Sequence, residues 1–229
     1  MSIGHDRQCP LETTIKETTV SMGVEIERKF LVKEFPDDLN KYPFHQIEQA
    51  YLNVSPAVRV RREDDTYYMT YKGLKGNAAP AGKMTTADGS NVTKPSGQFT
   101  EPGSSTQQTP VRIGQTEYNM PLTKEAYEHL SSKADGNIIT KKRYLIPLND
   151  DAFDEDIIEA NPELKAAVQN RSIKIELDVF EGVFTGRILA EVEFPSEEAA
   201  LVYHPAEWFS QDVTGDPKYS NAHMSAEQL

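Results

Sequence analysis

Eight short segments of this chain alternate polar or charged side chains with apolar ones at every second position. In a β-strand, residues i, i+2 and i+4 share a face, so each segment would present one charged face and one apolar face. Eight strands of this kind suit a closed barrel or a two-sheet sandwich. The alternation predicts strands over residues 24–32, 46–54, 57–63, 66–73, 116–122, 137–148, 172–180 and 188–195.

The charged faces are sorted by sign. Acidic residues dominate the first, seventh and eighth segments, and basic residues dominate the third, fourth and sixth. Glu25 and Glu27 share a face about 6.5 Å apart, where they would repel by roughly 2.5 kcal/mol at an effective dielectric constant near 20. A single half-solvated antiparallel strand could carry such a pattern. The sorting by sign argues against that simple reading. If the strands close into a barrel with the charged faces inward, the interior would need water, a metal ion and a polyanion to be stable.

Composition and charge narrow the function classes. The chain has 229 residues, enough for one substantial core, and a net charge of -12. This charge argues against a nucleic-acid coat protein or a membrane-surface binder. A single cysteine, Cys9, together with the absence of a secretion-signal pattern or an apolar span, predicts a cytoplasmic protein.

Two segments differ from the alternating pattern. Residues 1–22 are polar and weakly patterned, and we expect them to form a mobile extension before one domain at 23–229. Residues 74–111 are rich in Gly, Pro, Ser and Thr and poor in aromatic residues, which predicts a low-complexity insertion between two strands. Helices are expected near residues 122–132, 150–170 and 195–204, on the outside of the sheet.

The segment Glu25-Ile26-Glu27-Arg28-Lys29 resembles the ExExK signature of the CYTH superfamily, the triphosphate tunnel metalloenzymes. The resemblance continues in order through VRVR, TYKG, TEYN, TKKRY, KIELDVFEG and AEVEFP. A closing motif follows at residues 212–214 and 218–221. Several motifs in the correct order make the resemblance specific.

The resemblance implies a mainly β (α+β) fold, an eight-stranded antiparallel closed β-barrel tunnel with a few helices packed outside. It also implies chemistry on a triphosphate with Mg²⁺ or Mn²⁺. The implied metal ligands are Glu25, Glu27, Glu191 and Glu193. The implied phosphate-binding residues are Lys29, Arg59, Arg61, Lys72, Lys141 and Arg143. The attacking water would be oriented by a second metal or by a carboxylate among Glu117, Glu176 and Asp178.

One motif departs from the family pattern. Strand five reads Gln115-Thr116-Glu117-Tyr118-Asn119, so the family's leading arginine is missing and one acid is an amide. This departure weakens the case for a second metal held by the protein more than for the first.

The predicted function is metal-dependent hydrolysis of a small triphosphate by water attack on a terminal phosphate. Inorganic tripolyphosphate is the first candidate substrate, followed by thiamine or nucleoside triphosphate. The alternatives are a class IV-type adenylate cyclase and a non-catalytic polyphosphate- or nucleotide-binding module. The expected partner is a small-molecule triphosphate, with no nucleic-acid polymer and no membrane, and a homodimer is left open.

Overall fold

A computed structural model describes residues 21–36, 38–73 and 114–229 of the chain. The predicted insertion at 74–111 lies outside the described residues. So does the predicted extension, apart from residues 21 and 22, which belong to the first strand. The proposals about these two segments therefore remain predictions.

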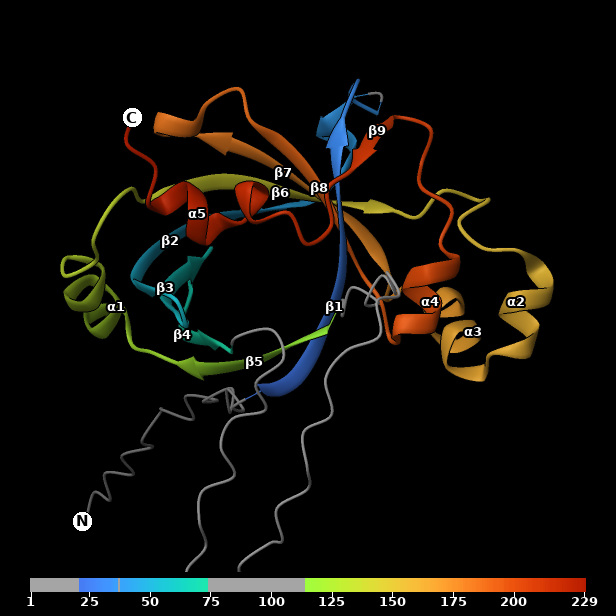
Figure 1. The fold of residues 1–229 in the computed structure, drawn as a ribbon, viewed down its shortest axis with the longest axis horizontal. Coiled ribbons are helices and arrows are strands. Elements are labelled where there is room, and N and C mark those ends of the chain that lie inside the picture. The colour runs from blue at the N-terminus through green and yellow to red at the C-terminus, as the bar shows by residue number, and fades with distance from the viewer. Residues whose placement is uncertain (1–20, 37, 74–113) are drawn as a thin grey trace, which may run out of the picture.

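The closed barrel implied by the family resemblance is present, and the sandwich that the alternation left open is excluded. Eight antiparallel strands pair in the order β5-β4-β3-β2-β6-β7-β8-β1, and β1 returns to β5 to close the ring (Figure 1). The short ninth strand, which pairs with the end of β1, was not predicted. The strands are β1 (Ser21–Val32), β2 (Phe44–Val54), β3 (Ala57–Glu63), β4 (Thr66–Lys72), β5 (Gly114–Pro121), β6 (Ile139–Pro147), β7 (Lys174–Glu181), β8 (Ile188–Glu193) and β9 (Phe209–Asp212).

Strand β1 closes the barrel because it is long enough to serve different partners along its length. Residues 21–26 pair with β5, and residues 27–31 pair with β8. Residues 30–32 pair with β9. The ExExK segment therefore lies at the point where the partners of β1 change.

The helices are short, and two of them begin at the caps expected from the sequence. The Thr123 hydroxyl accepts a hydrogen bond from the Ala126 amide at 3.2 Å, and Ser196 caps its helix in the same way. Asn161 ends one helix and caps the next. The helices are α1 (Lys124–Ser131), α2 (Glu155–Ala160), α3 (Pro162–Gln169), α4 (Glu197–Val202) and α5 (Asn221–Ser225), with 3₁₀ turns η1 (Leu39–Lys41), η2 (Gly182–Phe184) and η3 (Pro217–Tyr219). No helix among the described residues has the length and apolarity needed to cross a bilayer.

The apolar faces of the strands point outward, and helices cover part of them, while Val24, Tyr71 and Met120 stay exposed. The largest core cluster joins the outer faces of β1, β7 and β8, through Phe30, Leu177 and Val192, to Leu164 of α3 and Ala200 of α4. Figure 1 shows α2, α3 and α4 together on one side of the barrel and α1 on the opposite side. Because the apolar faces are used outside, the charged faces are left inside.

Part of the barrel interior is apolar. Ile139, Phe180 and Leu189 form a buried cluster with Tyr51 and with Met224 of α5. This cluster fills the space beside α5, so the charged residues are confined to the remaining part of the interior.

Candidate active site

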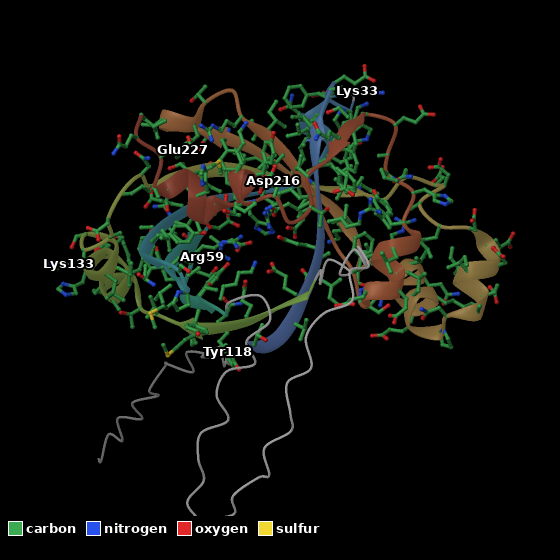
Figure 2. All side chains as sticks on the ribbon, viewed as in Figure 1. Lys33, Arg59, Tyr118, Lys133, Asp216 and Glu227 are labelled. Atoms are coloured by element: carbon green, nitrogen blue, oxygen red, sulfur yellow. The ribbon has the colours of Figure 1, made fainter. Side chains whose placement is uncertain are left out.

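The barrel interior holds two neighbouring cavities, of about 300 and 360 Å³. Glu25, Glu27, Arg61, Arg143 and Glu191 line both of them. The first cavity is lined by every predicted phosphate-binding residue, namely Lys29, Arg59, Arg61, Lys72, Lys141 and Arg143. Figure 2 shows Arg59 directed into the ring of strands and Tyr118 on the outside of β5. The face assignments made from the alternation therefore bring these cations to one place.

The wall formed by β6 and β7 is a compact ion-pair network around Asp178. This carboxylate is fully buried, contacts Lys141 Nζ, and accepts hydrogen bonds from Arg143 Nε and Nη2 at 2.7 Å each. Arg143 also contacts Glu176 and Glu191. Burial and the neighbouring Arg143 lower the pKa of Lys141 to about 8, although Asp178 opposes the shift.

A second set of contacts joins β3, β4 and β5. Glu117 Oε2 lies 3.5 Å from Lys72 Nζ and 3.8 Å from Arg59 Nη2. Burial acts to raise the pKa of Glu117, but Arg59 and Lys72 outweigh it and the pKa is lowered. Asn119, the amide in place of an acid, donates to Glu117 Oε1 at 3.0 Å and accepts from the Thr70 hydroxyl at 2.6 Å. The amide thus orients the remaining carboxylate of β5.

Lys29 is held by acids of β1 and β8. Its Nζ lies 2.8 Å from Glu191 Oε1 and 3.7 Å from Glu27 Oε1. Burial opposes ionisation of both partners, but their mutual attraction raises the pKa of Lys29. The pKa of Glu191 is held well below its usual range, with Arg143 as a further cause. Glu191 is therefore an ionised carboxylate that is already paired with cations.

Glu193 is in the opposite situation. It stands directly across from Glu27 in the β1–β8 register. Burial and then the carboxylates of Glu25, Glu176, Glu27 and Glu117 raise the pKa of Glu193 to about 7. No basic side chain in the described part of the chain forms an ion pair with it.

The carboxylates around Glu193 fit a hard divalent cation in their donor chemistry. Oxygen ligands suit Mg²⁺ and Mn²⁺, and a bound cation would relieve the repulsion that raises the Glu193 pKa. Across the described residues, no three acidic, histidine or cysteine side chains are already drawn together as a metal cage. Binding would therefore require the carboxylates to turn toward the ion.

The three predicted water-orienting carboxylates occupy different environments. Glu117 and Glu176 line the second cavity. Asp178 lines neither cavity and lies against Lys141 and Arg143. Its contacts are those of a counter-ion, and a role for it in orienting water remains a prediction.

Sequence reasoning did not identify several residues of the interior. Tyr51 lines the first cavity and accepts a hydrogen bond from Arg59 Nη1 at 3.4 Å. Glu63 and Tyr68 line the second cavity. Tyr51 lies on an almost uncharged strand face, so charge sorting could not mark it. Its pairing with Arg59 across the β2–β3 register appears only in the structure.

The closing motif covers part of the first cavity. Val213, Thr214, Asp216 and Asn221 contribute to its lining. The Lys29 amide donates to the Thr214 hydroxyl at 3.0 Å, and the Val213 amide donates to the Lys29 carbonyl at 2.8 Å. This segment is thus attached to β1 at the lysine of the ExExK signature.

Comparisons with known proteins agree with the geometry. No protein-family model matches the sequence. An inorganic triphosphatase from Nitrosomonas europaea is 30% identical over 201 residues, which cover 86% of this chain and 93% of that protein. The chain belongs to the inorganic triphosphatase family. A second member, from Acetivibrio thermocellus, is 26% identical over 204 residues, covering 89% of this chain and 94% of that protein.

The family assignment extends to solved structures. The crystal structure of an inorganic triphosphatase superposes with a TM-score of 0.51 at 26% identity, covering 89% of this chain and 95% of that one. A second crystal structure of the same protein gives a TM-score of 0.50 at 26% identity, covering 89% of this chain and 98% of that one. The resemblance to the CYTH tunnel enzymes is therefore confirmed, and so is the closed eight-stranded fold.

Proposed function

We propose that this member of the inorganic triphosphatase family hydrolyses a small triphosphate inside its tunnel, with inorganic tripolyphosphate as the first candidate substrate. One observation carries the proposal. Six basic side chains from β1, β3, β4 and β6 line a single cavity of about 300 Å³ that also contains Glu25 and Glu27. A chain of phosphates is a ligand that needs several cations in one small space.

The basic residues would bind the phosphates and balance the charge that develops during cleavage. Arg59, Arg61 and Arg143 can donate paired hydrogen bonds, while Lys29, Lys72 and Lys141 act as point charges. Positioning and charge neutralisation are sufficient for phosphoryl transfer, so no covalent nucleophile is required. Glu117 and Glu176 line the adjoining cavity, where either could orient the attacking water.

A divalent metal is part of the proposal, with Mg²⁺ or Mn²⁺ held by Glu25, Glu27 and Glu193. Glu191 was predicted as a further ligand, and it would have to exchange its contacts with Lys29 and Arg143 for the metal. When bound, such an ion would polarise a phosphoryl oxygen and neutralise charge on it. The support for this part is the repulsion among carboxylates around Glu193.

Some finer predictions accompany this proposal. A cytoplasmic location, a homodimer and the order of preference among triphosphates stay predictions. The adenylate cyclase and binding-module alternatives are retained as outcomes of the experiment below.

The test measures orthophosphate release from tripolyphosphate, thiamine triphosphate and ATP, with Mg²⁺, Mn²⁺ or EDTA. Glu27→Ala is the inactive control. Glu128→Ala, on the exposed helix α1, is the matched control that removes one carboxylate far from the tunnel. Metal-dependent release that only Glu27→Ala abolishes would support a triphosphatase.

Two other results would replace the proposal. Cyclic AMP and pyrophosphate from ATP would indicate a cyclase. Tight binding of tripolyphosphate without turnover under any metal would indicate a binding module, and β5 with its Asn119 would then be the first strand to alter.

A further inference from the structure

Arg61 lies where the two cavities meet, and two side chains fix its guanidinium group. Its Nη2 lies 3.0 Å from Glu63 Oε2. The same oxygen accepts a hydrogen bond from the Tyr68 hydroxyl at 2.7 Å. The guanidinium carbon lies 5.6 Å from the centroid of the Tyr68 ring. The Glu63 carboxylate holds one end of the guanidinium group, and the Tyr68 ring packs beside it.

One donor of Arg61 is left without a partner. Arg61 Nε is buried and has no hydrogen-bond partner among the described residues. Gln49, which pairs with Arg61 on the neighbouring strand β2, is also buried with both amide atoms unpaired within the same set. With neither of these groups paired, the polar and cation–π contacts that fix the guanidinium group within the described residues are those with Glu63 and Tyr68.

The position of Glu63 is unexpected for a site that binds anions. Burial acts to raise its pKa, but Arg61, the Tyr68 hydrogen bond and His45 outweigh this and lower it. His45 Nδ1 lies 3.9 Å from Glu63 Oε1 and 2.7 Å from Asp64 Oδ2. An ionised carboxylate beside a phosphate-binding arginine should repel substrate if charge alone determines affinity.

We propose that Glu63 and Tyr68 are positioning residues. They hold the Arg61 guanidinium group where the two cavities meet, in position to bind a phosphate in the first cavity. This inference rests on the proposed function, because it assumes that the first cavity binds a triphosphate. The benefit is preorganisation: an arginine that is already oriented loses less freedom when substrate binds. Neither residue touches the reacting atoms in this scheme.

The test compares variants for which charge and positioning predict opposite results. Glu63→Ala should raise the tripolyphosphate KM roughly tenfold with a smaller change in kcat, because one well-oriented charged contact is lost. Glu63→Gln should have a smaller effect, since its amide oxygen can still accept from Arg61 and Tyr68. Tyr68→Phe should raise KM severalfold, and Glu128→Ala should leave it unchanged.

If charge alone matters, Glu63→Ala and Glu63→Gln would both lower KM, and by similar amounts. That result would overturn the proposal. So would an unchanged KM in all three variants at positions 63 and 68. Urea unfolding of each variant identifies any that fails to fold, and Glu63→Gln and Tyr68→Phe preserve the test if the alanine variant is unstable.

A double-mutant cycle separates positioning of Arg61 from a general structural role. Lysine at position 61 keeps the charge but has no planar fork to orient. In the Arg61→Lys protein, Glu63→Ala should therefore add little to the loss of affinity. Fully additive losses would mean that Glu63 acts independently of Arg61 and would contradict the inference.

Isothermal titration with tripolyphosphate, with and without Mg²⁺, keeps this test distinct from that of the proposed function. If the unaltered protein binds tripolyphosphate but does not cleave it, the proposed hydrolysis fails. The affinities of the position 63 and 68 variants would still decide the positioning role. If the unaltered protein does not bind tripolyphosphate at all, both proposals are overturned.

Discussion

The two walls of the tunnel treat charge in different ways. On the β6–β7 wall, Lys141 and Arg143 each contact Asp178, and Arg143 contacts two further carboxylates. On the β1–β8 wall, Glu193 faces Glu27 without an ion pair in the described part of the chain, and its pKa is about 7. On the first wall, the charges are neutralised by ion pairs between neighbouring residues. On the second wall, the Glu193 carboxylate is repelled by its neighbours and does not stabilise the fold. Charges that the fold does not need are the better candidates for function.

The largest expected effect is on activity, from Glu27→Ala on the acidic wall. If Glu27 holds the metal, hydrolysis should fall roughly a thousandfold, because several kcal/mol of charge stabilisation are lost. The free energy of unfolding should stay the same or rise, since one of several repelling carboxylates is removed. Phosphate release and urea unfolding measure the two quantities. If Glu27→Ala loses activity because it no longer folds, Glu27 is needed for stability, and the two walls do not differ in the way described.

The next effect is on stability, from Asp178→Asn on the compensated wall. At pH 7 the variant leaves buried Lys141 and Arg143 without their shared carboxylate, which should cost about 3 kcal/mol of unfolding free energy. The cost should shrink as pH rises through 8, because the charged form of Lys141, whose pKa is already lowered, is then lost. Urea unfolding at pH 7 and 9.5 measures it.

Glu193→Gln is the matched comparison for Asp178→Asn, since it makes the same change on the other wall. It should leave stability unchanged or raise it, because the Glu193 carboxylate is repelled by its neighbours. Equal destabilisation by the two substitutions would show that the walls do not differ energetically.

A smaller effect is expected from pH on substrate binding. Because the pKa of Lys141 is lowered to about 8, Lys141 is charged below pH 8 and loses its charge as pH rises above it. The tripolyphosphate KM should therefore rise severalfold between pH 7 and 9.5. Lys141→Arg keeps its charge over this range and should reduce the rise. Since ionisation of the substrate is common to both proteins, identical pH profiles would exclude Lys141 as the cause.

The strands and most of the charged interior could be predicted because both depend on the alternation of side chains, whereas the choice of a closed barrel over a sandwich rests on the family resemblance. Each predicted phosphate-binding residue lines the first cavity, since a strand with one apolar face has no choice about where its charges point. The caps at Thr123 and Ser196 are also local features and were found where expected. Local rules were sufficient for these elements.

Other features depend on contacts between distant segments, which a single sequence does not show. The pairing of β9 with β1 places the closing motif over the first cavity, across more than 180 residues of chain. Glu176 and Asp178 are both acidic residues of β7, but Glu176 lines the second cavity and Asp178 does not. Only the structure shows that Asp178 pairs with Lys141 and Arg143. Glu63 shares the face of Arg59 and Arg61 by the same alternation, but a lone acid at the end of a basic strand carries no signal of a role.

The smallest expected effect comes from Asn119→Asp, which restores the family's second acid on β5 and so makes the acidic side more acidic. Without metal, the new carboxylate would face Glu117 in place of an amide that donates to it at 3.0 Å, which should cost about 1 to 2 kcal/mol of stability. With Mg²⁺ or Mn²⁺, the same carboxylate would be an added oxygen donor, so the metal should raise the melting temperature more than in the unaltered protein. Thermal unfolding with EDTA measures the stability cost, and thermal unfolding with metal measures the added stabilisation by the ion. Asn119→Ala controls for loss of the hydrogen bond alone. If Asn119→Asp gains no extra stabilisation from metal, position 119 lies outside the reach of the ion, and the amide serves only to orient Glu117.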